Sequence, residues 1–368
     1  MKKILFNKKV MNNLKLILTA LLFINSNVAN AEILSVRVEK PDWFKVLNFD
    51  SSWNIILDGE IDADAPARVN EALKKTGSDG ADVYINSPGG NLLAGMQIGR
   101  LIRNAGANTH IGILITDPSK KFTELGLKYI PGQCLSACTF AFIGGVYRYS
   151  VEGSEFGVHR FSKKSGPELN DLDDAQVISA AISTYINEMD VDIELFDLMV
   201  QEDKKNIKIL SYAETIRLNV INNGRKKPKW SIEAIEGGQY LKGFQESSHG
   251  YGKALLSCEK GKMLLSSYYE IGVEKAKNIA SGTWYHSLLV NEKVIALPNP
   301  DVKIARGNEI FTVFYLSKKS ALEIASSSSM GHAIQFVREA PTYFGYSIDI
   351  PDSDSQKVSA FIKNCFKR

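Results

Sequence analysis

Three short segments carry residue types that together suit acyl transfer. Ser136 lies in GQCLSACT (residues 132–139), where a glycine permits a sharp turn and an apolar run of small residues follows. A serine at such a strand-to-helix turn holds its hydroxyl near backbone donors, and the next residue offers an N–H to an oxyanion. His159 is a candidate general base. The glycines of INSPGG (residues 85–90) let the backbone approach a ligand and direct N–H groups at it.

Each of these segments also has an ordinary structural interpretation. A serine before a helix is a good N-cap, which is the alternative for Ser136. A single histidine on a strand is often a packed side chain, and His110, in an expected strand, is interpreted in that way. Most Pro-Gly-Gly turns are only turns. The argument for chemistry therefore depends on whether the chain brings Ser136, His159 and the glycine turn together.

Two of the four cysteines flank the candidate nucleophile. Cys134 and Cys138 either form a disulfide that stiffens the turn or remain as two small buried thiols. Pairing by proximity then joins Cys258 to Cys365, which would tie the last helix to the preceding β-rich segment. Four cysteines allow three pairings, so the sequence leaves the connectivity open.

The elements that must position these residues alternate between strand and helix. Apolar runs predict strands at residues 52–58, 81–90, 108–115 and 154–161. Helical spacing predicts helices at residues 65–77, 91–106, 136–145, 172–189, 192–201 and 211–221. The alternation predicts a mainly parallel α/β sheet, which we place at residues 32–225. Residues 116–131 interrupt the pattern and are interpreted as a polar loop or a short insertion.

The last part of the chain has a different pattern of apolar and turn residues. Residues 226–368 hold short β-rich runs separated by turn residues, and they are expected to form a smaller β-rich domain, such as a sandwich. A hairpin is expected about Asn291-Glu292. Residues 354–366 are expected to close the chain as an amphipathic helix.

The N-terminus has the three parts of a secretory signal peptide. Five lysines and no acid precede a short apolar run at residues 16–23, and Ala29-Asn30-Ala31 supplies the small-residue exit. We expect cleavage after Ala31 and a periplasmic or secreted protein; the alternative is an uncleaved amphipathic anchor. The apolar run is too short to span a bilayer, and no later segment is long enough, so no transmembrane segment is expected after cleavage. Removing residues 1–31 lowers the formal charge from +3 to −2, which argues against a nucleic-acid partner.

The sequence offers no signal for a bound group. The acidic run at residues 168–176 includes Asp171, Asp173 and Asp174 but lacks the glycine and the distal glutamate of an EF-hand loop. It is interpreted as a helix N-terminus whose acids complement the helix dipole. No P-loop, dinucleotide fingerprint or zinc-ligand spacing occurs, so neither a cofactor nor a metal is expected.

Taken in order along the chain, the motifs resemble those of the Clp protease proteolytic subunit, within the ClpP/crotonase superfamily. The family's Tyr-Ile-Asn-Ser-Pro-Gly-Gly matches YINSPGG (residues 84–90), and its Gly-Gln-Ala-Ala-Ser-Met-Gly-Ala-Phe aligns with GQCLSACTF (residues 132–140), with Ser136 at the nucleophile. Its Met-Ile-His-Gln aligns with GVHRF, which offers His159. The segment ILSYAETIRLNVIN (residues 209–222) resembles the family's Phe-Leu-Ser ending. The resemblance covers about residues 50–225.

This resemblance implies a spiral of repeated β-β-α units and a serine peptidase that acts on a peptide or protein. The export signal and the β-rich tail separate the chain from cytosolic ring proteases fed by an ATP-driven unfoldase, so a peptidase independent of ATP is expected. It implies backbone N–H donors of Gly89 and Ala137 as the oxyanion hole, with Ser136 as nucleophile and His159 as base. The superfamily often forms rings or trimers, which implies a homo-oligomer. The family's aspartate is missing, because Ile207 occupies its place. Neighbouring Asn206 and Asp203 are the candidates for a third member.

Two other hypotheses remain beside a serine hydrolase. The fold can be kept as a catalytically inactive scaffold or binding protein of the cell envelope, since the aspartate is absent and the histidine is followed by Arg160. A crotonase-type acyl-CoA enzyme shares the same oxyanion-hole scaffold. It fits an exported chain poorly, because CoA esters are cytosolic substrates.

Overall fold

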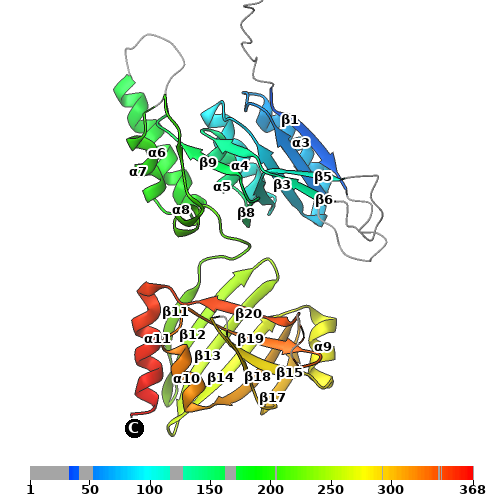
Figure 1. Ribbon diagram of the computed structural model, residues 1–368, viewed down its shortest axis with the longest axis vertical. Coiled ribbons are helices and arrows are strands. Elements are labelled where there is room, and N and C mark those ends of the chain that lie inside the picture. The colour runs from blue at the N-terminus through cyan, green and yellow to red at the C-terminus, as the bar shows by residue number, and fades with distance from the viewer. Residues whose placement is uncertain are drawn as a thin grey trace, which may run out of the picture. The chain divides into compact units, whose positions relative to one another are not determined.

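The structure is a computed structural model, and it divides into two compact units that are described separately (Figure 1). Unit 1 comprises Met1–Gly145 with Ser150–Leu218, and unit 2 comprises Val146–Tyr149 with Asn219–Arg368. The residues described are 33–40, 53–116, 127–161, 171–203, 205–291, 293–338, 340 and 342–367. The expected signal peptide, residues 1–31, lies outside them. The domain boundary at 225/226 stays a prediction.

The larger sheet of unit 1 contains β1 (Ser35–Glu39), β2 (Trp53–Asp58), β3 (Ala81–Asn86) and β4 (Asn108–Ile111), in this order. The short strand β8 (Arg148–Ser150) begins in the segment Val146–Tyr149 of unit 2. β2, β3 and β4 run parallel, and β1 is antiparallel to β2. β2 and β3 are buried over most of their length, as expected for parallel strands covered on both faces. The parallel α/β arrangement expected here is confirmed.

Two helices connect these strands, and their ends follow local sequence signals. α3 (Ala65–Thr76) buries Val69, Ala72 and Leu73 and ends at Gly77, whose φ of 56° suits a C-cap glycine. A short 3₁₀ turn, η1 (Gly77–Asp79), follows. α4 (Leu92–Asn104) begins after Asn91, whose side chain accepts a hydrogen bond from the N–H of Ala94. Both helices confirm the predicted ones.

One expected strand, residues 108–115, is in fact two. The chain breaks at Gly112, whose φ is 127°, and β5 (Ile113–Thr116) then leaves the parallel sheet. A Cβ on Gly112 would lie 2.7 Å from the carbonyl oxygen of Ile130, so only glycine fits this bend. β5 pairs antiparallel with β6 (Leu127–Ile130). The loop expected at residues 116–131 is therefore wrong for residues 127–130, which form a strand. Residues 117–126 lie outside the described residues.

A second, three-stranded sheet carries the candidate serine and histidine. Its order is β10-β9-β7, formed by β7 (Gln133–Leu135), β9 (Glu155–Val158) and β10 (Lys208–Ile209). β7 and β9 are parallel, and β10 is antiparallel to β9. The helix that follows β7, α5 (Cys138–Ile143), is entirely buried, as predicted.

Further helices follow in unit 1, and a residue of the first of them bonds to α5. They are α6 (Asp171–Glu188), α7 (Glu194–Gln201) and α8 (Tyr212–Arg217). The Tyr185 hydroxyl of α6 donates to the carbonyl oxygen of Phe140 at 2.6 Å. Arg103 of α4 donates to the carbonyl oxygens of Gly144 and Gly145, at 2.8 and 2.9 Å, just beyond the C-terminus of α5. These bonds fix the helix that begins two residues after Ser136.

The capping box that predicts α8 is present, but the helix is shorter than expected. The Ser211 side chain and the Glu214 carboxylate each bond the other's backbone N–H. The helix ends at Arg217 instead of residue 221, because Asn219 takes a φ of 54° and turns the chain away.

Unit 2 consists of two antiparallel sheets that enclose one apolar core. The six-stranded sheet has the order β11-β12-β13-β14-β18-β17, and the four-stranded sheet β16-β15-β19-β20. The strands of the first are β11 (Lys229–Ile235), β12 (Gly238–Ser247), β13 (Gly250–Glu259), β14 (Lys262–Glu270), β17 (Val302–Arg306) and β18 (Glu309–Leu316). Those of the second are β15 (Tyr285–Val290), β16 (Lys293–Ala296), β19 (Ser329–Gln335) and β20 (Phe344–Asp349). The β15–β16 pair confirms the hairpin expected about Asn291.

Three helices complete unit 2. They are α9 (Val273–Ser281), α10 (Lys318–Ile324) and α11 (Asp352–Cys365). α11, red in Figure 1, packs against β13, β14 and α10. It confirms the predicted closing helix and is linked to β13 by the Cys258–Cys365 disulfide, with the two Cα atoms 5.5 Å apart.

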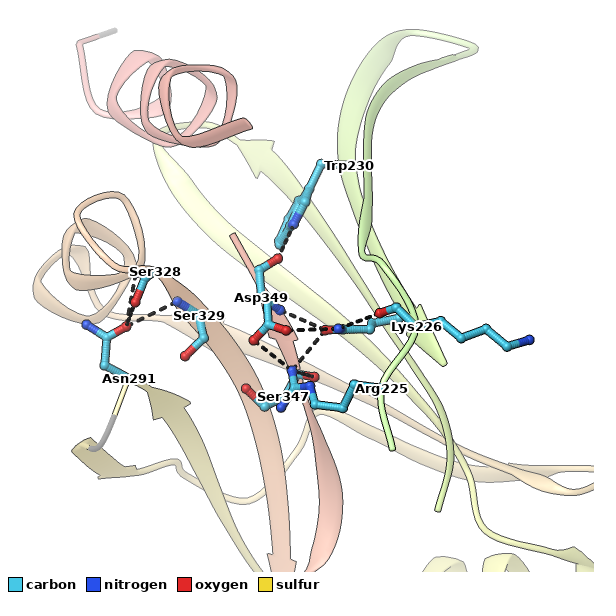
Figure 2. A network of polar contacts seen from close by, with 9 residues as sticks. Arg225, Lys226, Trp230, Asn291, Ser328, Ser329, Ser347 and Asp349 are labelled. Carbon is cyan, nitrogen blue, oxygen red and sulfur yellow. Dashed lines mark hydrogen bonds and ion pairs between the residues drawn. The ribbon is translucent and has the colours of Figure 1, made fainter. Parts of the chain in front are cut away.

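A polar network attaches residues 225–230 to the sheets of unit 2 (Figure 2). The Arg225 guanidinium donates to the Asp349 carboxylate at 2.8 Å and to the carbonyl oxygen of Ser347 at 2.9 Å. The Trp230 indole N–H donates to the carbonyl oxygen of Asp349 at 2.8 Å. Nearby, the Asn291 side-chain oxygen accepts from the backbone N–H groups of Ser328 and Ser329 and so fixes the hairpin turn. The segment before β11 is therefore an integral part of this unit.

Candidate active site

Ser136 lies in a backbone conformation that L-residues rarely adopt. It follows β7 directly and has a φ of 54°, in the left-handed region. Its N–H donates to the carbonyl oxygen of Gly157 at 2.9 Å, and its own carbonyl accepts from the N–H of Thr139 at 3.0 Å. The N-cap of α5 is Ala137, so Ser136 does not occupy the capping position that its alternative interpretation requires. A strained turn of this kind exposes a side chain at the end of a strand.

The Ser136 hydroxyl points at the predicted histidine. Its Oγ lies 2.7 Å from Nε2 of His159, which follows β9. The pairing of Leu135 with Gly157 in parallel strands explains this contact, because the two side chains leave the same edge of the sheet. The structure therefore brings together two residues that are 23 positions apart in the sequence.

The other ring nitrogen of His159 determines what Nε2 can do. Nδ1 lies 2.9 Å from the backbone carbonyl oxygen of Arg160, which can only accept a hydrogen bond. Nδ1 therefore carries the proton in the neutral ring, and Nε2 is left to accept the proton of the Ser136 hydroxyl. Arg160 is anchored in turn, since its N–H donates to the carbonyl oxygen of Glu202 at 3.1 Å and its Nε to that of Val200 at 3.0 Å.

Neither candidate for a third member is hydrogen-bonded to this ring among the described residues. Asp203 accepts the N–H of Lys205 at 2.9 Å, and the N–H of Asn206 donates to the carbonyl oxygen of Asp203 at 3.0 Å. Ile207, at the place of the family's aspartate, immediately precedes β10. The pairing of Lys208 with Val158 puts Ile207 opposite His159 when the register is extended by one residue.

The glycine turn packs directly against Ser136. Gly89 and Gly90 have φ values of 106° and 133°, and a Cβ on Gly89 would lie 2.7 Å from the Cβ of Ser136. The Gly89 N–H, expected to serve an oxyanion, donates to Oγ of Ser87 at 3.1 Å. The N–H groups of Gly90 and Ala137 have no hydrogen bond to any residue that the structure describes. Gly89 and Ala137 were the expected donors; of the two glycines, Gly90 is the one whose N–H has no partner among the described residues.

A cavity of about 390 Å³ opens onto these groups. This volume falls in the range of small-ligand sites. Ser136, Ala137, His159 and both glycines line it, and so does Glu60. Its apolar walls are Pro88, Leu92, Phe140, Phe161, Met199 and Ile207. The arrangement can present an apolar side chain next to a hydroxyl, an imidazole and two backbone donors.

Both expected cysteine pairs lie at disulfide distance, which fits an exported protein. Cys134 and Cys138 have Cα atoms 5.2 Å apart and bracket Ser136. Of the described helices, none is long and apolar enough to cross a membrane. The described residues also contain no cluster of three His, Cys, Asp or Glu side chains that could hold a metal ion.

Comparison with known proteins gives little further support. No protein-family model matches the chain, and no curated protein matches it. Among solved structures, a mutant of ClpP1 from Listeria monocytogenes matches with a TM-score of 0.33 and 18% sequence identity. The match covers 46% of this chain and 88% of that chain. A TM-score this low carries no argument about function, so the case for chemistry depends on the geometry of the site itself.

Proposed function

We propose that this chain is an exported serine hydrolase, a peptidase that needs no ATP. The observation that carries the proposal is the 2.7 Å contact between Ser136 Oγ and His159 Nε2, made by a serine in a strained turn beside the glycine turn. A surface or core serine has no need of this backbone conformation. The apolar cavity beside the pair supports a peptide or protein substrate with an apolar side chain at the cleaved bond.

The proposed reaction is acyl transfer through a covalent intermediate. His159 Nε2 takes the Ser136 proton while Oγ forms a bond to the substrate carbonyl carbon. The oxyanion receives hydrogen bonds from the N–H of Ala137 and from the glycine turn, where Gly90 supplies the free N–H and Gly89 the close backbone approach. The proton on Nε2 then passes to the departing amine, whose bond to the carbonyl carbon breaks. Water, activated by the same nitrogen, finally releases the acid and restores Ser136.

The carbonyl oxygen of Arg160 takes the orienting role in this proposal. It selects the tautomer with a proton on Nδ1, which is one of the two tasks of a triad aspartate. The other task is to stabilise the imidazolium that forms, and a neutral carbonyl does this less well than a carboxylate. The enzyme is therefore expected to be slower than one with a full triad.

The wider assignments belong to the same proposal. Residues 32–225 form a ClpP-like domain with repeated β-β-α units, residues 226–368 a separate β-rich domain, and residues 1–31 a signal peptide that directs the chain to the periplasm or outside the cell. A homo-oligomer is part of the proposal, by analogy with the superfamily.

A catalytically inactive scaffold is the alternative, and one observation favours it. No carboxylate among the described residues is hydrogen-bonded to His159. Hydrolysis of fluorogenic peptides and p-nitrophenyl esters by the purified full chain, without ATP, separates the two. We expect turnover by the wild type and by S281A, which alters an exposed serine of α9, and none by S136A. Equal rates in all three, or none in any, would reject the hydrolase. Heat on titration with acyl-CoA esters would instead favour a crotonase-type enzyme.

A further inference from the structure

A disulfide closes the turn that holds Ser136. Cys134 is in β7 and Cys138 is the first residue of α5, so the bridge joins the residue two before Ser136 to the residue two after it. Both cysteines are fully buried. The aligned family motif has alanine and glycine at these two positions, so this bridge is a departure from it.

The turn needs such a constraint more than an ordinary turn does. Ser136 keeps a φ of 54°, which is unfavourable for any residue with a Cβ. The backbone before it is fixed by the N–H of Leu135, which donates to the carbonyl oxygen of Ser87 at 3.1 Å. Beyond it, the N–H of Ala137 must stay unbonded if it is to serve an oxyanion. Relaxation of Ser136 to a common φ would rotate both its Oγ and this N–H.

We propose that the Cys134–Cys138 disulfide is a positioning element that holds Ser136 Oγ against His159 Nε2. The inference rests on the proposed function, and it states that this function requires the disulfide. Its consequence is that the site is competent only when oxidised. A dithiol reductant would break the Sγ–Sγ bond and supply two electrons and two protons, leaving two thiols while it becomes a cyclic disulfide.

The test compares two double variants of the full chain. C134A/C138A removes this bridge, and C258A/C365A removes the bridge of unit 2 as the matched control. Inactivation by a fluorophosphonate is measured over a range of concentrations, to separate the binding constant from the rate of the covalent step. We expect C134A/C138A to lower the covalent rate at least about tenfold with unchanged binding, and the control to match the wild type. Equal covalent rates in folded C134A/C138A and wild type would overturn the proposal.

A second readout separates failure of this inference from failure of the proposed function. The ¹⁵N signals of the His159 ring, assigned by comparison with H159Q, report the hydrogen bond to Ser136 without any turnover. If the fluorophosphonate does not label the wild type, the hydrolase is rejected. The positioning role of the disulfide still predicts that C134A/C138A shifts the ring signals in the way that S136A does. Unchanged ring signals in C134A/C138A would overturn the positioning role alone.

Reduction covers the case in which C134A/C138A fails to fold. The C258A/C365A variant contains only the Cys134–Cys138 disulfide. Any thiols that mass spectrometry finds after treatment with dithiothreitol therefore come from Cys134 and Cys138. Labelling is expected to fall as these thiols appear and to return on reoxidation. Labelling that persists after both thiols have formed would contradict the proposal.

Discussion

Ser136 and His159 meet because the strands before them are adjacent and parallel, and the contact needs no long-range adjustment of side chains. The serine contributes a hydroxyl held by an unusual φ, and the histidine a ring whose tautomer is set by a backbone carbonyl. Both features concern the backbone more than the side chains. This explains why the serine and the histidine meet although no carboxylate among the described residues is hydrogen-bonded to the ring.

Restoring a carboxylate at this place tests the role of the Arg160 carbonyl. Ile207 is expected opposite His159, so the variant I207D puts a carboxylate within reach of Nδ1. We expect the hydrolysis rate to rise about tenfold or more, since a charged partner stabilises the imidazolium. The rate is measured with the same peptide substrates and compared with that of I209D.

I209D is the matched control for this gain. Ile209 faces the same side of the strand but pairs with Gly157, two residues before the histidine. It adds the same charge without reaching Nδ1. A gain of equal size in both variants would show that the added charge acts on substrate binding instead of on His159.

Several elements followed from local sequence signals. Gly77 and the Ser211–Glu214 capping box are local signals of helix ends that the structure has, because caps depend on neighbouring residues only. The break at Gly112 and the strand at residues 127–130 did not follow, since each depends on a partner that is distant in the sequence. Likewise, no residue type predicts that a backbone carbonyl will face Nδ1 of His159.

In unit 2, the buried side chain of Gln245 is expected to contribute strongly to stability. Its oxygen accepts from Arg225 at 2.9 Å and from the N–H of Asp349 at 2.8 Å. Its nitrogen donates to the carbonyl oxygen of Lys226 at 2.8 Å. The variant Q245L removes the partner of the Asp349 N–H and of the Lys226 carbonyl oxygen, while Arg225 keeps its bonds to Ser347 and Asp349. We expect this loss to cost about 2–3 kcal/mol.

Urea unfolding followed by tryptophan fluorescence measures this loss, since Trp230 belongs to the same network. Q239L, on the same strand β12 but exposed, is the control and should change stability by less than about 0.5 kcal/mol. Equal stability of Q245L and Q239L would mean that water or movement of the chain satisfies the network after substitution.

For the molecule as a whole, two compact units carry different polar clusters. Unit 1 holds the proposed site, and the core of unit 2 buries His286 and His332 with their rings stacked at 5.2 Å. Nδ1 of His286 lies 3.0 Å from Nε2 of His332. The change in the sequence pattern beyond residue 225 predicted a β-rich segment there. The histidine pair was not predicted, because the two residues are 46 positions apart and come from different strands.

This pair predicts that acid destabilises the protein. Burial lowers the pKa of His286 to about 4, with a smaller effect of Lys303, and lowers the pKa of His332 well below its ordinary value of 6.5. The unfolded chain therefore binds more protons than the folded one below pH 6.5. Stability present above that pH should be lost as the pH falls toward 4, by up to about 1.4 kcal/mol per pH unit for each histidine.

Melting temperatures of the full chain at pH 7.5, 6 and 5 measure this effect. The variant H286F removes one titrating group and should show a weaker dependence on pH than the wild type. H249Q, which alters an exposed histidine, should keep the full dependence. A melting temperature of the wild type that does not fall between pH 7.5 and 5 would contradict the prediction.

The central claim, that Ser136 is a nucleophile activated by His159, is tested most directly by mapping a covalent adduct. The oxidised full chain is treated with a fluorophosphonate, digested and sequenced by mass spectrometry. The account predicts an adduct on Ser136, none in S136A, and formation slowed about 10²–10⁴-fold in H159Q, the usual contribution of a general base. An unmodified Ser136 in the folded wild type, or an adduct that forms equally fast in H159Q, would contradict it.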